Sequence, residues 1–281
     1  MKIIKNILNK IIALFFGLSD LKYLRIQILN TLKGGQSLSK GYYNFFDIFF
    51  NKINLGVESS DYCIYDVGAN DGWFARVMLR FVPEAEIISF EPLKSQLASL
   101  VQLKDKNKNF SFYPFALGSE NVKVDINEFG TNGLSSILNF TENSYDYNIR
   151  NFDTTIVASY SVECFRLDSL DYLTSGKENK VKILKIDTQG FEMNVIQGAS
   201  RLFENKFFDF VIIEVLTIEK YTGGPLYFDI INKMTDYGYN LCELFPSCRE
   251  KNGWVTEFDV IFSKQQFSDN YKNFMSKKNS Y

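Results

Sequence analysis

The stretch IYDVGANDGWF, residues 64–74, decides the fold. Its first residues complete a short apolar run, YCIYDV, which predicts a buried strand with Asp66 near its end. A glycine turn follows, and the residues from Trp73 to Phe81 have the pattern of a helix. Gly68 and Gly72 permit backbone conformations and a close ligand approach that a side chain would block. Because open α/β sheets bind ligands at the carboxyl ends of their strands, this turn is the first candidate for a binding site.

A second acidic residue, Glu91, ends the next predicted strand, EIISFE. From there a carboxylate can accept hydrogen bonds from two ribose hydroxyls of a bound cofactor. A dinucleotide site is expected to carry Gly-x-Gly-x-x-Gly, but Asn70 and Trp73 stand where the second and third glycines would be. Asn tolerates a left-handed backbone, so the turn remains feasible while a nicotinamide cofactor is disfavoured. The turn and the two acidic residues together predict a site for an adenosine-containing cofactor.

Strand-like and helix-like stretches alternate along the rest of the chain. After EIISFE, the predicted strands are FSFYPFAL, VKVDI and LSSIL around a turn at 130–133, VECFRL, VKILKID, FDFVIIEVL, NLCELF and EFDVIFS. The predicted helices are 93–104, 191–203 and 226–237. This alternation favours a parallel sheet covered on both faces, and the last two strands, with no helix between them, add an antiparallel edge strand. We therefore predict an α/β fold with a doubly wound, mostly parallel seven-stranded sheet, the Rossmann-like variant of class I methyltransferases.

Composition excludes several classes of function. The chain has 281 residues, a formal net charge of −2 and no histidine. The absence of histidine excludes Ser-His-Asp and Cys-His catalysis and any zinc site that needs imidazole. A chain without a basic surplus is not expected to have nucleic acid as its main partner. The four cysteines show no Cys-x-x-Cys spacing, so the sequence contains no redox motif or zinc ribbon.

The first 18 residues predict an amphipathic helix. Apolar and polar side chains separate on a helical wheel, with Ile4, Ile7, Leu8, Ile11, Ile12 and Phe15 on one face and Lys2, Lys5, Asn6, Asn9 and Lys10 on the other. Such a helix packs against its own domain, packs against a second subunit in a homodimer, or lies on a membrane surface. No apolar run approaches the roughly 20 residues of a membrane span. We expect a cytoplasmic protein, with contact to the inner membrane face as the open alternative.

Three segments are predicted. Residues 1–55 form an N-terminal helical segment, whose aromatic stretch GYYNFFDIFFNKI belongs to the core or forms a lid over the acceptor. Residues 56–265 form the cofactor-binding domain. Residues 266–281 form a Lys- and Asn-rich tail.

The sequence resembles the FkbM family of S-adenosylmethionine (SAM) dependent methyltransferases. The resemblance covers roughly residues 60–263 and is carried, in order, by YDVGANDGWF, FEP, FALGS, VECFRLDSLDYL and KIDTQGFEMNVIQGA. The segment KIDTQGFE is particularly close to the family's Lys-x-Asp-x-Glu-Gly-x-Glu. One departure is Gln189, which stands where the family commonly has Glu. The resemblance therefore assigns Gln189 no role as a base or a metal ligand.

The resemblance implies a role for each matching residue. The methionine end of SAM would be held by Asp66, Gly68, Asn70 and Gly72, its ribose by Glu91, and its adenine would lie beside Ala116 and Leu117. The acceptor would be a hydroxyl on a sugar, a surface glycan or a natural product.

A hydroxyl acceptor must lose its proton when it is methylated. Without histidine, the base must be a carboxylate, a tyrosine, a lysine or a metal-bound group. Asp187, at the end of a central strand, is the first candidate, and Glu214, a carboxylate in an apolar strand, is the second. A divalent metal suits such oxygen ligands, but no ligand spacing demands one, so it is left unassigned.

Two alternatives remain open at this point. The first is an NAD-dependent oxidoreductase, which keeps the fold and changes the chemistry. The second is a non-catalytic scaffold with a Rossmann-like fold. Ligand binding separates both alternatives from a methyltransferase.

Overall fold

The structure is a computed structural model that describes residues 57–131, 133–141, 153–249 and 253–265, together with Phe46, Phe50 and Phe267. Two compact units are distinguished, Met1–Gly56 and Val57–Tyr281. In the first unit, Phe46 and Phe50 are helical and their rings stack at 5.8 Å, which agrees with the helical spacing of the aromatic stretch. The predicted amphipathic helix at 1–18 and the tail at 266–281, Phe267 excepted, lie outside the described residues, so the predicted segment boundaries stay predictions.

All of the named strands and helices belong to the second unit. Its strands are β1 (Tyr62–Val67), β2 (Glu86–Phe90), β3 (Phe110–Tyr113), β4 (Ala116–Leu117), β5 (Val122–Phe129), β6 (Ile156–Phe165), β7 (Val181–Ile186), β8 (Phe210–Leu216), β9 (Asn240–Arg249) and β10 (Val255–Ser263). Its α-helices are α4 (Trp73–Phe81), α5 (Leu97–Lys106), α6 (Asp171–Thr174), α7 (Glu192–Gly198), α8 (Ser200–Glu204) and α9 (Tyr227–Asp236). Short 3-10 turns occupy Ser59–Asp61, Lys94–Gln96 and Leu167–Ser169.

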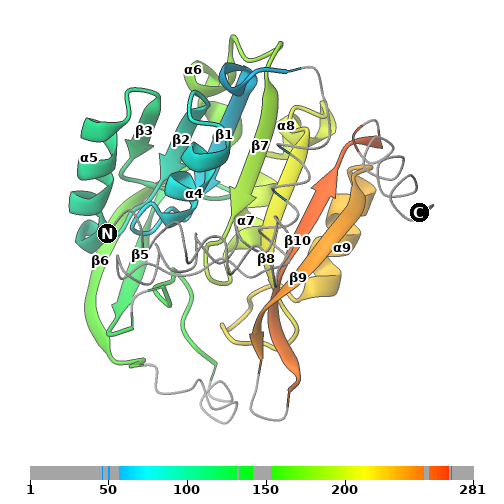
Figure 1. The fold of residues 1–281 in the computed structure, drawn as a ribbon. Helices are drawn as coiled ribbons and strands as arrows, with labels where there is room; N and C mark the ends of the chain where they lie inside the picture. The colour runs from blue at the N-terminus through cyan, green and yellow to red at the C-terminus, as the bar shows by residue number, and fades with distance from the viewer. Residues whose placement is uncertain are drawn as a thin grey trace, which may run out of the picture. The chain divides into compact units, whose positions relative to one another are not determined.

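Seven strands form the main sheet in the order β3-β2-β1-β7-β8-β10-β9 (Figure 1). The pairs from β3 to β8 are parallel, whereas β10 runs antiparallel to both β8 and the edge strand β9. The prediction of a doubly wound, mostly parallel seven-stranded sheet with antiparallel pairing at one edge is confirmed. The strand order reverses between β1 and β7, and this switch point is where such sheets bind ligands.

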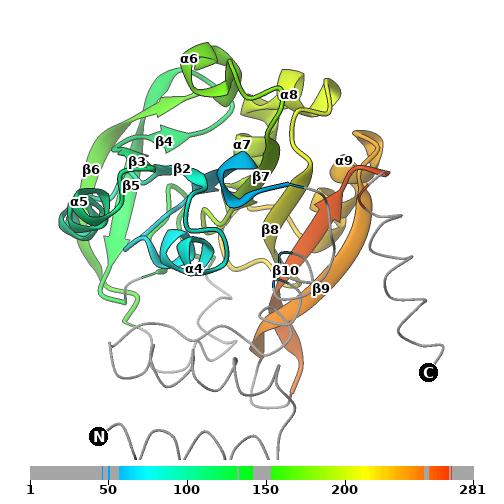
Figure 2. The same ribbon diagram turned by 45° about the horizontal axis from the view of Figure 1, so that its top comes forward.

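Helices cover both faces of the main sheet. Figure 2 shows α4 on one side of the sheet and α7 and α8 on the other. All six residues of β1 and of β7 are buried, because these strands lie at the centre of a sheet whose two faces are both covered. One large apolar cluster joins β1, β7 and β8 to the inner faces of α7, α8 and α9. The predicted helix at 191–203 is present as α7 and α8, separated by Ala199.

A second sheet of three strands has the order β4-β6-β5. The sequence predicts that residues 122–126 pair with 134–138, and this prediction is wrong. Strand β5 pairs along its length with β6, and only an isolated bridge joins Asn127 to Ser136. The predicted strand FSFYPFAL is likewise divided between β3 in the main sheet and β4 in the small one. Alternation in β5 and β6 marked both as strands, but their partners are far apart in the chain, which a local pattern does not reveal.

Within the part of the chain that the structure describes, no helix is long and apolar enough to cross a membrane.

Candidate active site

The glycine turn after β1 lies between the ends of two neighbouring strands. Gly68 has a φ of 76° and donates its N–H to the carbonyl of Phe90, at the end of β2, over 3.0 Å. A Cβ on Gly68 would lie 1.9 Å from the carbonyl oxygen of Asp187, just after β7. Only glycine fits here, since both the backbone angle and the available space exclude a side chain.

Gly72 lies at the start of α4 and packs against α5. It has a φ of 84° and is the residue before the first turn of α4. A Cβ there would meet the side chains of Leu103 and Leu100 of α5 at 2.9 and 3.1 Å. The structure thus shows Gly72 packing against a helix, and its predicted contact with the cofactor stays a prediction.

Glu91 ties the glycine turn to the segment after β2. Its Oε2 accepts the N–H of Asn70 at 2.6 Å and its Oε1 accepts the N–H of Leu93 at 2.8 Å. Burial raises the pKa of Glu91 to about 7, against the lowering effect of these two N–H groups. A carboxylate has roughly four acceptor positions, so two remain for further donors.

Two buried oxygen atoms at the turn lack hydrogen-bond donors among the described residues. They are Oδ1 of Asp66 and Oδ1 of Asn70. Asp66 is fully buried, and the hydroxyl of Ser89 reaches its other oxygen, at 3.3 Å, while the ammonium of Lys185 forms an ion pair with Oδ1 at 3.5 Å. Buried polar atoms are rarely left without partners, so the pair fits a ligand that brings N–H donors, such as the ammonium group of a bound amino acid.

Lys185 of β7 links the glycine turn to Asp187. Its Nζ lies 3.1 Å from the carbonyl oxygen of Gly68, 3.5 Å from Oδ1 of Asp66 and 3.2 Å from Oδ2 of Asp187. Burial by itself lowers the pKa of Lys185, but the charges of Asp187 and Asp66 outweigh it and raise the pKa. The ammonium therefore stays charged. Lys185 belongs to the segment KIDTQGFE, and its place between two acids is visible only in the folded protein.

Asp187 and Glu214, the two predicted catalytic residues, are brought together by Gln189. The side-chain Nε2 of Gln189 lies 2.9 Å from Oδ1 of Asp187 and 2.7 Å from Oε2 of Glu214. Asp187 keeps 32% of its side chain exposed, so a substrate can reach it. Burial by itself raises the pKa of Asp187, but Lys185 and then the Gln189 amide bring it below its usual value.

The surroundings of Glu214 have the opposite effect. Burial, followed by the charges of Asp187 and Glu257, raises the pKa of Glu214 well above its ordinary value. Its neighbour in the register of β10 is Asp259, whose pKa burial and Asp187 raise to about 7. Two acids whose environments separate their pKa values can divide acid and base roles between them. Here the pKa of Asp187 is lowered and that of Glu214 is raised.

Ala116 and Leu117 form the short strand β4. Ala116 pairs with Cys164 of β6, and both β4 residues are buried in apolar clusters. Their predicted place beside an adenine stays a prediction.

No group of three or more His, Cys, Asp or Glu in the described ranges is arranged to hold a metal ion. A divalent cation therefore stays unassigned.

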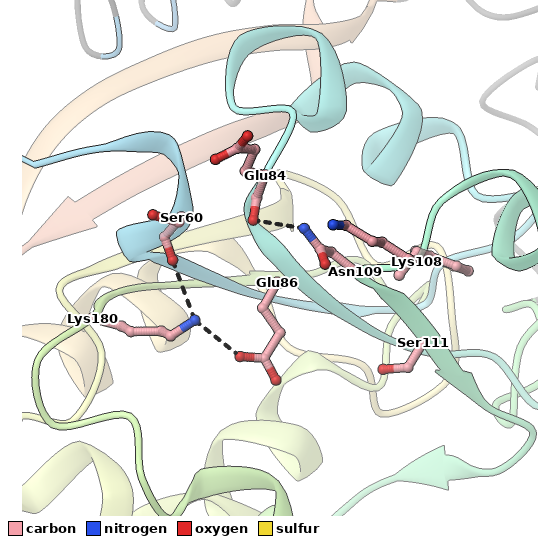
Figure 3. Close-up of a pocket in the computed structure, with 8 residues that line it drawn as sticks. Ser60, Glu84, Glu86, Lys108, Asn109, Ser111 and Lys180 are labelled. Carbon is pink, nitrogen blue, oxygen red and sulfur yellow. Dashed lines mark hydrogen bonds and ion pairs between the residues drawn. The ribbon is translucent and has the colours of Figure 1, made fainter.

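A cavity of about 590 Å³ lies at the opposite edge of the sheet, near the amino ends of β1, β2 and β7. Figure 3 shows Lys180 between Ser60 and Glu86: its ammonium lies 3.3 Å from the carbonyl oxygen of Ser60 and 3.3 Å from the carboxylate of Glu86. Lys177 contacts the same carboxylate. Among the described residues that line this cavity, no buried side-chain N or O atom lacks a partner, so the carboxyl ends of the strands are the better candidate site.

A family model described as the methyltransferase FkbM domain matches residues 66–241, more than half of the chain. The chain belongs to the FkbM methyltransferase family. The matched range includes every residue that the sequence analysis assigned to the site, from Asp66 to Glu214. The resemblance predicted from the motifs is confirmed.

Individual relatives have low sequence identity to this FkbM family member. The 2-O-methyltransferase NoeI of Sinorhizobium fredii is 27% identical over 174 residues, which cover 59% of this chain and 68% of the relative. The crystal structure of the methyltransferase FkbM from Methylobacillus flagellatus is 15% identical with a TM-score of 0.46, over 77% of this chain and 47% of that one. This chain thus spans under half the length of that crystallised protein.

A second similar structure is Aeropyrum pernix fibrillarin in complex with natively bound S-adenosyl-L-methionine. It is 14% identical, with a TM-score of 0.37, over 78% of this chain and 73% of that one. Structural similarities with TM-scores as low as these support no conclusion by themselves. The family rests on the domain match, and the fold rests on the strand order.

Proposed function

We propose that the protein is a SAM-dependent O-methyltransferase whose acceptor is a hydroxyl on a sugar, a surface glycan or a natural product. One observation carries the proposal most strongly. At the switch point between β1 and β7, Oδ1 of Asp66 in β1 and Oδ1 of Asn70 in the following turn accept no hydrogen bond from the described residues, and only the Lys185 ammonium, 3.5 Å from Asp66, lies near the first of them. Asp187, whose pKa is lowered by Lys185 and Gln189, follows β7. A cofactor with an ammonium group and an acceptor hydroxyl would meet there.

The residues at this site suit the ammonium group, the ribose and the adenine of SAM. Oδ1 of Asp66 and Oδ1 of Asn70 would accept N–H donors from its ammonium group, and the free acceptor positions of Glu91 would take its ribose hydroxyls. Ala116 and Leu117 offer an apolar strand for the adenine. The pattern does not suit a nicotinamide dinucleotide equally well, because the glycine turn lacks two of the three glycines.

The chemistry asks little of the protein beyond alignment and proton removal. SAM supplies a methyl group on a sulfonium, so a bond from the methyl carbon to the acceptor oxygen forms as the bond to sulfur breaks, and a neutral thioether leaves. Holding the two reactants in line contributes on the order of 7–11 kcal/mol. The carboxylate of Asp187 accepts the proton of the acceptor hydroxyl, which contributes about 10²–10⁴-fold in rate.

The choice of oxygen as the methylated atom is supported by the printed name of one relative, a 2-O-methyltransferase at 27% identity. The composition supports an acceptor other than nucleic acid. The proposal includes a cytoplasmic location and a contact of residues 1–18 with a membrane surface or a second subunit. Those parts rest on the sequence alone.

Ligand binding to the full chain tests the class of protein. We expect SAM and S-adenosylhomocysteine, but not NAD, to bind in calorimetry and to raise the melting temperature, since a ligand at 100 times its Kd stabilises a protein by about 2.7 kcal/mol. Glu91→Ala should weaken binding by about 1–3 kcal/mol, the effect of losing a charged hydrogen-bond partner. Binding of NAD alone would favour an oxidoreductase, and a folded protein that binds none of the three would favour a scaffold.

A further inference from the structure

The side-chain amide of Gln189 has partners at both ends. Its Nε2 donates to Oδ1 of Asp187 over 2.9 Å and to Oε2 of Glu214 over 2.7 Å. Its Oε1 lies 2.8 Å from the hydroxyl of Tyr221, which also has the carbonyl oxygen of Leu134 within reach at 3.1 Å, and 3.4 Å from Nζ of Lys220. An amide offers two donor hydrogens and an oxygen with two lone pairs, so the site uses its full capacity.

These partners also decide which way round the amide lies. A flipped amide would place its oxygen against two carboxyl groups and its NH₂ against the ammonium of Lys220. The contacts with Asp187 and with Lys220 would be unfavourable, because a carboxylate offers no hydrogen and an ammonium offers no lone pair. The side chain therefore has a single orientation, with its donors toward Asp187 and Glu214.

The backbone of Gln189 is held as firmly as its side chain. Its φ of 55° is uncommon for a residue other than glycine. The carboxylate of Glu192 accepts the N–H groups of Thr188 and Gly190 on either side, and the hydroxyl of Ser136 donates to the carbonyl oxygen of Gln189 over 2.7 Å. Backbone strain persists where the surroundings over-determine it, and it gathers at functional sites.

The packing of Tyr221 fixes the position of its hydroxyl, which faces the oxygen of the Gln189 amide. Tyr221 is fully buried and its ring stacks on Phe140 at 4.9 Å. A Cβ on Gly190 would lie 2.9 Å from the Tyr221 side chain, so glycine is needed for the tyrosine to approach. The hydroxyl of Tyr221 thereby has a fixed position opposite the Gln189 amide.

We propose that Gln189 is a positioning residue for methyl transfer: its amide holds the Asp187 carboxylate in place against Glu214, with Tyr221 and Lys220 fixing the amide. Lys185 engages one oxygen of Asp187 and Gln189 the other, at 3.2 and 2.9 Å. The carboxylate thus has a defined direction while part of it remains exposed to the acceptor. This inference rests on the proposed function and deepens it.

The charged and titratable groups around Asp187 come from five elements and the loop after β8: Asp66, Lys185, Glu192, Glu214, Lys220, Tyr221, Glu257 and Asp259. Lys220 already pairs with Glu257 at 2.7 Å, and Lys185 is shared between Asp66 and Asp187. Among the described side chains, Gln189 is thus the uncharged donor between the two acids. Removing it takes away the donor that Asp187 and Glu214 share.

The first test measures protonation directly and needs no acceptor. Side-chain carboxyl carbons are followed by ¹³C NMR from pH 3 to 10 in the wild type, Gln189→Leu and Tyr221→Phe, with Gln102→Leu on the exposed face of α5 as the matched control. We expect Gln189→Leu to raise the pKa of Asp187 by about one unit or more, since a hydrogen bond to a charged group is lost. Tyr221→Phe should shift it in the same direction by less. Unchanged Asp187 titration in both variants would overturn the proposal.

The second test measures turnover on an acceptor found with methyl-labelled SAM. Gln189→Glu keeps the size of the side chain but cannot donate when ionised, so we expect a 10- to 100-fold loss of kcat, an altered pH profile and a KM for SAM within about twofold of wild type. Wild-type kcat in Gln189→Glu would overturn the proposal. A wild-type protein that binds no SAM would overturn the proposed function instead, while the NMR titration would still decide the role of Gln189.

Discussion

Single residues at the site have backbone conformations that most side chains disfavour. Gly68, Asn70 and Gln189 have φ angles of 76°, 50° and 55°. Each lies in a turn at the carboxyl end of a parallel strand, where a left-handed residue turns the chain sharply. Gly68 is required by space as well as by angle, whereas Asn70 and Gln189 bring side chains that serve the site.

Gly68→Ala tests the close approach of the turn to β7. Gly176→Ala is the matched control, because Gly176 has a nearly equal φ of 73° and no atom within 4 Å of an added Cβ. Both changes should cost about 1–2 kcal/mol for the left-handed backbone. Gly68→Ala should lose clearly more, because its methyl group would displace the carbonyl oxygen of Asp187, and it should also weaken binding of S-adenosylhomocysteine. Equal losses in urea unfolding would show that the close approach does not matter.

Asp187→Asn tests whether this single residue is the base. The amide keeps the shape of the carboxylate but cannot accept a proton, so kcat should fall by about 10²-fold or more. The affinity for SAM should change little, and both are measured with methyl-labelled SAM. A variant that binds SAM poorly but turns over normally at saturation would make Asp187 a cofactor residue.

At the scale of elements, the turn between β7 and α7 depends on Glu192. Its carboxylate accepts the N–H groups of Thr188 and Gly190 and the hydroxyl of Thr188. Burial raises the pKa of Glu192 to about 7, against the lowering effect of these backbone N–H groups. The folded state therefore binds this proton more tightly than the unfolded chain does. The resulting stabilisation is complete below pH 4.5 and is lost as the pH rises through 7.

Glu192→Gln removes this titration. We expect the stability of the wild type relative to Glu192→Gln to fall by about 3 kcal/mol between pH 4.5 and pH 8, since each unit of pKa shift corresponds to about 1.4 kcal/mol. Glu91 and Asp259, whose pKa values burial also raises to about 7, titrate in both proteins and cancel in the difference. Urea unfolding at several pH values measures it, with Glu204→Gln on the exposed side of α8 as the control. A constant difference would contradict the raised pKa.

The main sheet has an amino edge and a carboxyl edge, named after the two ends of its parallel strands. Across the whole domain, buried charges are arranged differently at these two edges. At the amino edge, Asp209 accepts the N–H of Lys182 at 2.7 Å and the ammonium of Lys264 at 2.8 Å, which joins β7 to the ends of β8 and β10. Its carboxylate also lies 3.6 Å from Nζ of Lys182. These buried charges pair with one another, whereas the carboxyl edge keeps orphaned acceptors and an exposed carboxylate.

Asp209→Ala should therefore destabilise the fold without affecting the site. Removing one partner of a buried ion pair leaves the other uncompensated, which costs about 3–5 kcal/mol. The Kd for S-adenosylhomocysteine should stay unchanged under conditions in which the variant is folded. Lys123→Ala, in the exposed pair with Glu163, is the control and should have little effect on melting. A changed Kd in Asp209→Ala would contradict the division between the two edges.

The sequence by itself determined the fold class, the family and the acidic residues at the strand ends. The signals for β1, its glycine turn and α4 are contiguous, and Asp66, Glu91 and Asp187 follow from the ends of apolar runs. Such features depend on local periodicity and backbone preference, which a sequence displays directly.

Only the tertiary structure decided what these residues contact. The partners of Gln189 lie 25 residues away at Glu214, 32 away at Tyr221 and 53 away at Ser136. Gly72 faces α5, and Lys185 joins two acids that belong to different strands. The reason is physical: a hydrogen bond depends on distance and angle in space, and these are set only when the strands take their order in the sheet.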